Sequence, residues 1–463
     1  MRIRWRTAPS RTGGGAKLIR ISLLLDGLHS MNTFLFPRSW SRAGRLGLLV
    51  FPALLTSYGC WPQPPSGGEE DALPDQEASV QDSAGILIVE TPEEIATAPL
   101  GWKIDSVPLL ALGSEENESE VFFGVRGLRA LPGGGVLVLD GGSRELRFFD
   151  SLGQLTHRVG RKGEGPGEFD RPYLVQTANS DSLLVWDGAL KRFQVFTGSG
   201  EYARMIRLNQ RWPMGGNPPM GAIDSLTLLR VSESPFDPQR RPGPVEETTR
   251  VFWYHPSTGV EVPITAIKAL DGVMLVRPGY REAGFYGIPF TTRPTATVNQ
   301  SSALFIDGVS PEIREYGVDG FLRRIFRVPG FRRPVNRAIE EENITYSLTR
   351  IARTTRAELE RLFDELPSPD TLPAFQSLQV DEVGWTWAEV YHWDRTIQSG
   401  RWMVFDPEGR AHGIIQTPDG LQIQRIGEDF LLGVRSDELG VERVFRYRLM
   451  RNLILAPRNR PDP

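Results

Sequence analysis

The sequence predicts an all-β fold, a six-bladed β-propeller, because one strand-and-turn pattern recurs along it. In each copy an Asp-Gly pair is followed, thirteen residues after the Asp, by a second Gly. An aromatic residue (Phe149, Phe196 or Tyr316) stands four positions before that Gly. Full copies run from Asp140 to Gly153, Asp187 to Gly200 and Asp307 to Gly320, and partial copies from Tyr254 to Gly259 and Phe405 to Gly409. Asp-Gly ends a strand in a turn and the later Gly closes a hairpin, and a repeat of about forty residues built this way is typical of a propeller.

The length of the chain supports a core that is divided among repeats. Roughly 400 residues follow residue 60, more than the usual limit of about 250–300 for one hydrophobic core. A propeller avoids this limit because each blade packs mainly on its two neighbours. The only cysteine is Cys60, so no disulfide within the chain can stabilise the fold.

Alternating or continuous apolar runs supply the strands of each blade in order. Blade one is expected at 128–131, 136–140, 145–149 and 155–159, and blade two at 173–177, 183–187, 193–197 and 202–208. Blade three is looser, with 226–231, a Pro/Glu/Arg insertion, 250–254 and 260–267. Blade four takes 295–299, 304–307, 313–316 and 322–328, and blade five takes 375–380, 385–391, 401–405 and 412–417. Blade six has only 421–426, 430–434 and 441–449.

The missing strand of blade six predicts how the ring closes. Residues 106–112 form an apolar run that belongs to no blade. Pairing of this run with 441–449 would leave no open sheet edge between the last blade and the first. We therefore expect the N-terminal strand to complete blade six, in a ring of six blades rather than five or seven.

The widest gap between repeats predicts a helical insertion between blades four and five, at about 336–367. Residues 338–353 and 356–366 have apolar side chains at helical spacing. Thr355 and Glu358 fit a capping box at the start of the second helix.

The N-terminal region predicts export. Residues 46–55 are a short apolar run with Arg38, Arg42 and Arg45 before it and the small Gly59 just before Cys60. This pattern is that of a secretory signal, too short for a comfortable transmembrane helix. With the cysteine directly after Gly59 it resembles a bacterial lipoprotein signal, which implies that Cys60 is lipidated and becomes the mature N-terminus. An ordinary cleaved signal and an uncleaved anchor are the alternatives.

Composition divides the chain into a targeting region, a tether, the propeller and a tail. Residues 1–60 are the targeting region, in which Met31 is an alternative start, and 61–84 are acidic and rich in small residues, as expected of a disordered tether. The propeller is expected at 85–451 and a flexible tail at 452–463. Because residues 1–60 carry nine Lys or Arg and one Asp in a chain of net charge −4, the remainder has a charge of −12. This acidity excludes nucleic acid as the expected partner and leaves the lipid anchor as the only expected membrane contact.

The glycine-rich string at 160–172 predicts a connector between blades one and two. Gly163, Gly165 and Gly167 could suggest a phosphate-binding loop, but a strand rather than a helix follows at Pro172. Gly-Glu-Gly-Pro-Gly-Glu-Phe at 163–169, with Val380-Asp381 and Gly384-Trp385 later, resembles exported bacterial six-bladed propellers of the NHL-like group. The resemblance covers roughly residues 85–450 and implies a fold and a location in the cell envelope or periplasm, not a reaction.

Catalytic and metal-binding patterns are weak. Asp140, Asp187 and Asp307 recur before Gly and are expected to form turns. Calcium in the central channel is the alternative, with Asn299 and Asp381 as candidate ligands. The histidines show no metal-ligand spacing, and only His392 and His412 could serve a lyase-type site. We therefore predict no catalytic residues and no cofactor.

The expected function is a binding or scaffold module for a peptide, glycan or protein ligand. Connectors between blades share one face of a propeller, where exposed aromatic and Arg side chains suit recognition. The candidate residues are Arg161, Lys162, Arg171, Tyr173, Trp212 and Tyr286, and the alternative for each is that it caps a blade core. The rival function is a lactonase-like hydrolase or a lyase with a metal in the channel.

Overall fold

The computed structural model describes residues 78–113, 121–178, 181–208, 218–233, 243–276, 283–350, 356–365, 369–393 and 400–451. The chain divides into two compact units, 1–52 and 53–463, and every described residue belongs to the second. The predictions for the targeting region, Cys60, most of the tether, Trp212 and the tail 452–463 lie outside the described residues.

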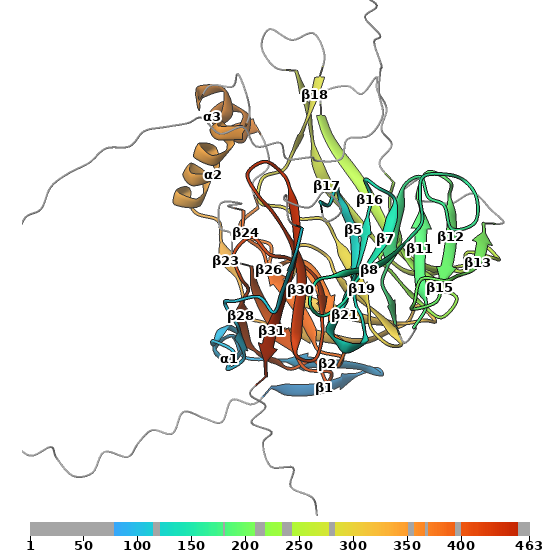
Figure 1. Ribbon diagram of the computed structural model, residues 1–463. Helices are drawn as coiled ribbons and strands as arrows, with labels where there is room; N and C mark the ends of the chain where they lie inside the picture. Colours follow the sequence, from blue (N-terminus) through green and yellow to red (C-terminus); the bar gives the residue numbers. More distant parts are fainter. Residues whose placement is uncertain are drawn as a thin grey trace, which may run out of the picture. The chain divides into compact units, whose positions relative to one another are not determined.

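Six antiparallel sheets form the blades of a propeller, as predicted (Figure 1). Blade one holds β5 (Val125–Ala130), β6 (Val136–Asp140), β7 (Glu145–Phe149) and β8 (Leu155–Val159). Blade two holds β9 (Pro172–Val175), β11 (Leu183–Asp187), β12 (Arg192–Phe196) and β13 (Tyr202–Arg207). Blade three holds β14 (Gly221–Ile223), β15 (Leu226–Glu233), β16 (Gly243–Tyr254), β17 (Glu261–Val276) and β18 (Ala283–Gly287), with β10 (Thr177–Ala178) parallel to β14.

The other three blades follow in chain order. Blade four holds β19 (Thr295–Val298), β20 (Ser302–Ile306), β21 (Glu312–Gly317) and β22 (Leu322–Arg327). Blade five holds β25 (Phe375–Val380), β26 (Thr386–Val390), β27 (Arg401–Phe405) and β28 (Ala411–Gln416). Blade six holds β29 (Gln422–Ile426), β30 (Phe430–Ser436) and β31 (Glu442–Met450). First strands contact one another from blade to blade, β5 to β9, β10 to β14, then β19, β25, β29 and back to β5, which closes the ring.

The repeated hairpin has the geometry that its sequence predicts. In blades one, two, four and five the register shifts at the aromatic residue, which is a β-bulge at Phe149, Phe196, Tyr316 and Phe405. The glycine four residues later has a positive φ, for example 90° at Gly200 and 93° at Gly409. Such a φ favours glycine over every other residue.

The same glycines also let neighbouring blades approach. A Cβ on Gly409 of blade five would lie 2.4 Å from the ring of Phe326 in blade four. A Cβ on Gly200 of blade two would lie 2.7 Å from the ring of Phe148 in blade one. Glycine is therefore required at these turns for two reasons: the positive φ of the backbone, and the close packing of the neighbouring blade.

The hydrophobic core lies between neighbouring blades. One cluster joins Leu304 and Phe326 of blade four to Phe375 and Phe405 of blade five. Another joins Phe149 of blade one to residues of blade six. Each blade therefore buries its apolar side chains against the next, as expected for a divided core.

The N-terminal strand closes the ring as predicted. Strand β4 (Leu110–Leu112) pairs antiparallel with β31, with Leu112 opposite Val444 and Leu110 opposite Arg446. The short strand β3 (Lys103–Ile104) pairs with the end of β31. The last blade therefore contains strands from both ends of the described chain.

A second N-terminal element adds to blade four. Strands β1 (Ser79–Ser83) and β2 (Ile86–Glu90) form an antiparallel hairpin, and β2 pairs in parallel with β22, with Leu87 opposite Arg324. The predicted tether, which extends to residue 84, therefore includes β1, which the structure shows as a strand. Backbone pairing with β22, burial of Val89 and the ion pair between Glu90 and Arg327 fix this hairpin.

Blade three differs most from its prediction. The insertion expected as a loop is largely strand, since β16 and β17 run for 12 and 16 residues and pair along most of their length. In Figure 1 these strands and β18 rise above the other blades. The expected strand 250–254 is only the end of β16. The prediction began too late because residues 243–250 include Pro, Glu and Arg and lack the apolar pattern of a strand.

The predicted helical insertion is present between blades four and five. Its helices are α2 (Arg337–Arg350) and α3 (Arg356–Glu365), which pack on each other, flanked by β23 (Arg333–Pro334) and β24 (Thr371–Leu372). A short helix, α1 (Glu93–Thr97), and a 3₁₀ turn, η1 (Pro132–Gly134), were not predicted. No helix among the described residues is both long and apolar enough to span a bilayer.

Candidate ligand-binding face

The blade topology places two sets of loops at one end of the ring. In a four-stranded antiparallel blade, the turn from second to third strand leaves from the same end as the connector to the next blade. We call this end the connector face, and the opposite end, with the turns from first to second strand, the inner-turn face. The loops 141–144, 188–191 and 307–311 and the connector 160–171 belong to the connector face.

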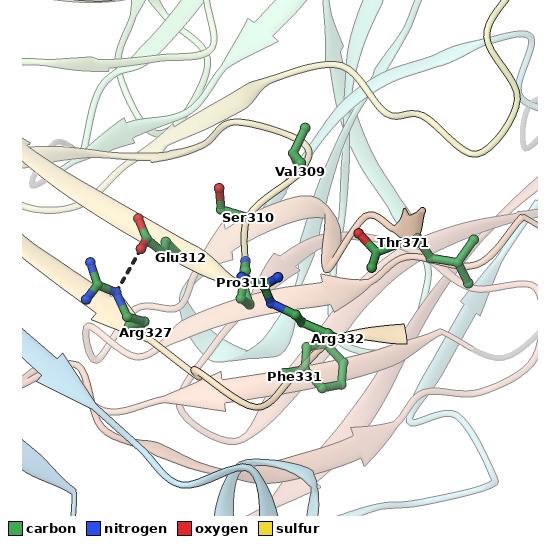
Figure 2. A pocket seen from close by; sticks show the side chains of 9 residues that line it. Val309, Ser310, Pro311, Glu312, Arg327, Phe331, Arg332 and Thr371 are labelled. Carbon is green, nitrogen blue, oxygen red and sulfur yellow. Dashed lines mark hydrogen bonds and ion pairs between the residues drawn. The ribbon is translucent and has the colours of Figure 1, made fainter. Parts of the chain in front are cut away.

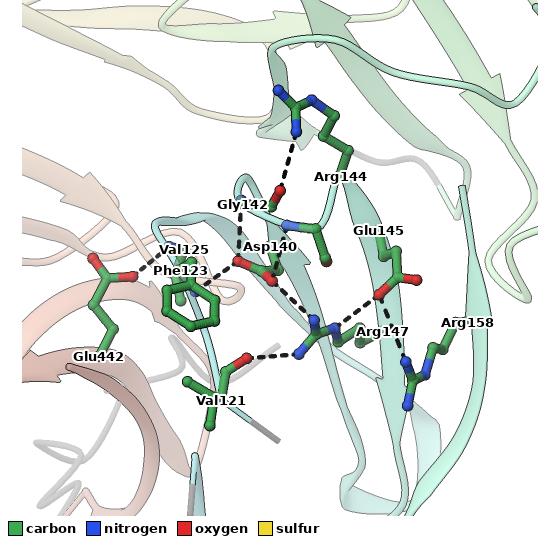
Figure 3. Close-up of polar contacts among 11 residues, drawn as sticks. Val121, Phe123, Val125, Asp140, Gly142, Arg144, Glu145, Arg147, Arg158 and Glu442 are labelled. Atoms are coloured by element: carbon green, nitrogen blue, oxygen red, sulfur yellow. Dashed lines mark hydrogen bonds and ion pairs between the residues drawn. The ribbon is translucent and has the colours of Figure 1, made fainter. Parts of the chain in front are cut away.

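The recurrent aspartates form turns, as predicted, and two of them also hold connectors. Asp140 is fully buried and accepts hydrogen bonds from Gly142 and Ser143 in its own turn. It also accepts one at 2.9 Å from the backbone N–H of Phe123, in the connector that enters blade one (Figure 3). Asp187 is equally buried and accepts the N–H groups of Asp170 and Arg171, at 2.9 and 3.1 Å, in the connector that enters blade two.

This second role was missed, although the sequence carries a signal for it. In both blades the connector residue that donates lies 17 positions before the aspartate, Phe123 for Asp140 and Asp170 for Asp187. The Asp307 carboxylate instead binds Val309 and Ser310 of its own turn. Buried carboxylates with so many backbone donors are structural anchors, because their lone pairs are already used.

Arg147 completes the anchor in blade one. Its guanidinium lies 3.0 Å from Asp140, 3.1 Å from Glu145 and 2.9 Å from the carbonyl oxygen of Val121 (Figure 3). The Arg147 side chain is only 6% exposed, so the pair is largely removed from water. The network holds the connector in place and leaves these charges unavailable to a ligand.

The glycine-rich string is a connector between β8 and β9, as predicted. Arg192 of β12 donates to the carbonyl oxygens of Gly165 and Glu168, and Gln194 accepts from Gly167. Hydrogen bonds from the Gly165 backbone and from Arg161 hold the pKa of the Glu168 carboxyl below its ordinary value. Side chains of blade two therefore fix the shape of the loop.

Four of the predicted site residues lie on or next to this connector. Arg161 is bound to Glu168 at 2.7 Å, and Lys162 is exposed. Arg171 donates to the carbonyl oxygen of Gly188 at 3.3 Å, and the guanidinium of Arg126 lies 5.2 Å from the ring centre of Tyr173. The chain thus brings all four to the junction of blades one and two, where three of them already have partners within the fold.

The other two predicted residues are not brought to this junction by the described structure. Tyr286 was expected in a connector, which is wrong, because it lies on β18 opposite Val273 of β17. Trp212 lies outside the described residues. The misplacement of Tyr286 has the same cause as the misread blade three, a long hairpin in a polar segment.

A pocket opens on the connector face between blade four and the helical insertion (Figure 2). Its volume is about 230 Å³, and we call it the blade-four pocket. Residues from the turn after β20, the end of β22 and the connector line it: Val309, Ser310, Pro311, Glu312, Arg327, Phe331, Arg332, Thr371 and Leu372. The sequence prediction missed all of them, because they come from segments as far apart in the chain as Val309 and Leu372.

The charged residues of the blade-four pocket differ in whether they form ion pairs within the fold. Glu312 and Arg327 form an ion pair at 2.7 Å on neighbouring strands, and Arg327 also binds Glu90. Arg332 is exposed, and its side chain makes no hydrogen bond or ion pair with the described part of the chain. Figure 2 shows Arg332 between Pro311 and Thr371, so one uncommitted positive charge faces an otherwise neutral or paired lining.

Arg333 fixes the floor of the pocket. It donates to the carbonyl oxygens of Tyr391 and Pro373, both at 2.6 Å, and its guanidinium lies over the ring of Phe331. Burial, with a smaller contribution from Arg401, lowers the pKa of Arg333 to about 10. The Arg333 guanidinium thus packs on Phe331, a buried residue that lines the pocket.

The candidate calcium ligands have other partners in the structure. Asp381 binds Val383, Trp385, Trp387 and Arg451, and the Asn299 side chain accepts from the N–H of Gln300. Among the described residues no group of three or more His, Cys, Asp or Glu could hold a metal ion. The calcium alternative is not tested by this observation and stays a prediction.

Comparison with known proteins gives a likeness of fold. No protein-family model matches the chain, and no curated protein matches it. A member of the DUF4221 family from Bacteroides vulgatus is 12% identical, with a TM-score of 0.44 over 75% of this chain and 98% of that one. A Bacteroides fragilis protein named as exported is 11% identical, with a TM-score of 0.38 over 78% and 98% of the two chains. Virginiamycin B lyase from Staphylococcus aureus is 10% identical, with a TM-score of 0.32 over 75% and 99%. At these identities no ligand or reaction carries over to this chain.

Proposed function

We propose that this protein is an exported, lipid-anchored propeller that binds a ligand through its connector face, at the blade-four pocket. The observation that carries the proposal is the lining of that pocket. Apolar surface from Phe331, Pro311 and Leu372 lies beside a positive charge on Arg332 that has no partner in the described structure. A concave apolar site with a few polar groups is the usual form of a ligand site.

The proposed export and lipid anchoring rest on the N-terminal sequence. The apolar run at 46–55 ends just before Cys60, and the only cysteine of the chain is at the position that a lipoprotein signal requires. The similarity of 163–169 to exported NHL-like propellers agrees with an envelope location. The acidic residues between Cys60 and β1 would then separate the propeller from the membrane.

Ligand capture by the full chain tests the function. Purified protein in detergent is incubated with a peptide and glycan extract of the cell envelope, and retained molecules are identified by mass spectrometry. The proposal expects retention that is lost in Arg332→Ala and kept in Arg158→Ala. Arg158 is a suitable control because its exposed side chain lies 4.0 Å from Glu145, far from the pocket residues in sequence. Equal retention by both variants would refute the pocket as the binding site.

A further inference from the structure

The blade-four pocket favours an anionic ligand over a cationic one. The Arg332 side chain forms no hydrogen bond or ion pair with the described part of the chain. Glu312, the acidic residue among the described lining residues, is already paired with Arg327 and Arg314, with nitrogen-to-oxygen distances of 2.7 and 3.1 Å. A cationic ligand would therefore meet a carboxylate that already has two partners. An anionic ligand would meet the Arg332 guanidinium, which has none in the described chain.

The backbone around Arg332 is held by hydrogen bonds that need no ligand. The Phe331 N–H donates to the carbonyl oxygen of Val328 at 3.0 Å, and the Arg332 N–H donates to that of Gly330 at 2.7 Å. On the other side, the Arg333 guanidinium donates to two backbone carbonyl oxygens, both at 2.6 Å. Binding therefore has to order only the Arg332 side chain, which keeps the entropic cost small.

The buried part of the pocket lining is apolar. Phe331 and Leu372 are 6% and 8% exposed, whereas Val309 is 70% exposed. Phe331 is stacked on Phe375 of blade five, with 6.0 Å between the ring centres, so this wall belongs to the core between blades four and five. An apolar group of leucine size that is buried against these side chains should raise the affinity by about tenfold or more.

The volume of the pocket limits the size of the group that enters. A cavity of about 150 Å³ holds a benzene ring, and the blade-four pocket measures about 230 Å³. This space suits one apolar side chain with an adjoining carboxylate, and it is too small for an oligosaccharide. Because Val309 and Arg332 are exposed, the rest of a longer ligand is able to extend over them into solvent.

We propose that the blade-four pocket binds the C-terminal residue of a peptide whose last side chain is apolar. The α-carboxylate accepts paired N–H bonds from the Arg332 guanidinium, and the side chain packs on Phe331 and Leu372. The Thr371 hydroxyl lines the same pocket, has no hydrogen-bond partner in the described chain and is a further donor to the carboxylate (Figure 2). This inference rests on the function proposed above and adds the class of ligand.

Titration calorimetry of the full chain in detergent with N-acetyl-leucine tests the class of ligand. N-acetyl-leucinamide is the neutral probe of nearly equal shape. We expect one N-acetyl-leucine per chain, and affinity for the amide that is lower by about tenfold or more, because the bond to a charged group is lost. N-acetyl-glycine should also bind about tenfold or more weakly, since it lacks the apolar side chain. An acetylated peptide of two glycines and a C-terminal leucine should bind as tightly as N-acetyl-leucine.

Arg332→Gln should weaken N-acetyl-leucine binding by about tenfold and leave binding of the amide unchanged. The two losses do not add, because the variant and the amide each remove the same interaction. Arg337→Gln is the matched control, since Arg337 is an exposed arginine at the start of α2 that is not among the pocket residues. It should leave both affinities unchanged. An equal loss in the two variants would mean a general attraction between charges and would overturn the proposal.

The probes also separate a wrong ligand class from a wrong site. Equal affinity for N-acetyl-leucine and its amide, or no binding of either, would overturn the inference, and the proposed function would stand if envelope molecules were still retained through Arg332. Tighter binding of isocaproate than of the peptide would assign the pocket to a small free acid and overturn the assignment to a peptide end. Retention of envelope molecules that does not depend on Arg332 would refute the site itself.

Discussion

Arg451 and Asp381 form a buried ion pair that joins the end of the described chain to the first turn of blade five. The guanidinium nitrogen and the carboxylate oxygen lie 2.8 Å apart, and the two side chains are 7% and 0% exposed. Arg451 also lies over the ring of Trp102, with 4.5 Å from its guanidinium carbon to the ring centre. The segment before β3, blade five and the C-terminal end of β31 are therefore linked through one residue.

Asp381→Asn should destabilise the protein by about 3–5 kcal/mol, because it leaves Arg451 buried without its counter-charge. Urea unfolding of the variant and the wild type measures this difference. Asp319→Asn is the matched control, since Asp319 pairs with Arg323 at an exposed site. Its cost should be about 0–1 kcal/mol. Equal costs for the two variants would mean that the buried pair does not contribute as argued.

Gly409→Ala should lower the free energy of unfolding by about 2–5 kcal/mol. The loss combines the strain of a left-handed backbone with the overlap of the new Cβ with Phe326. Gly440→Ala separates the two causes, because Gly440 has a φ of 80° in a similar turn but nothing near its Cβ. Its cost should be about 1–2 kcal/mol. Thermal unfolding compares the variants, and a Gly440 variant as unstable as the Gly409 variant would contradict the packing argument.

Asp406 should make stability depend on pH in the acid range. Burial favours its neutral form, but hydrogen bonds from His412 and from the backbone of Arg410 hold its pKa below the ordinary 3.8. Since the folded pKa lies below the unfolded one, the carboxylate stabilises the fold fully above 3.8. That stabilisation is lost as the pH falls through the folded value.

Asp406→Asn measures this contribution. The variant should be less stable than the wild type at pH 7 by about 1–3 kcal/mol, and the difference should shrink as the pH falls below the unfolded pKa. Urea unfolding at a series of pH values follows it. A difference that stays constant between pH 7 and the acid range would show that the Asp406 carboxylate is not responsible.

Cys60→Ala should release the protein from the membrane fraction, because the lipid attached to the thiol is the proposed anchor. Cell fractionation followed by immunoblotting measures the distribution. Ser57→Ala serves as the control, since it changes the signal segment without removing the thiol. Unchanged membrane association of Cys60→Ala would contradict lipid anchoring.

Metal analysis of the purified protein should show no stoichiometric calcium, since the Asp381 carboxylate is bound to Arg451 and to Trp387. Chelation should accordingly leave the unfolding temperature unchanged. One bound calcium per chain, with a lower unfolding temperature after chelation, would instead favour the hydrolase or lyase alternative.

The repeat was predictable because its information is local. A left-handed glycine and a bulged aromatic act within five residues of each other, as in Phe405 to Gly409, so each copy specifies its own hairpin. Ring closure was predictable for a related reason, since blade six lacked a strand and residues 106–112 lacked a blade. The extent of blade three was not predictable in this way, because its long strands include Pro and Glu. These residues have low strand propensity, which the pairing of β16 with β17 overrides.

The sequence by itself determined the blade architecture and the order of the blades. Only the tertiary structure decided which charged groups remain available to a ligand. Arg161 and Arg332 are both exposed arginines in connectors, yet the first is bound to Glu168 and the second is not. Arg425 and Leu128 are nearly three hundred residues apart, and Arg425 donates to the carbonyl oxygen of Leu128 because blades one and six are neighbours in the ring. Such pairings depend on how whole blades pack, which no short stretch of sequence specifies.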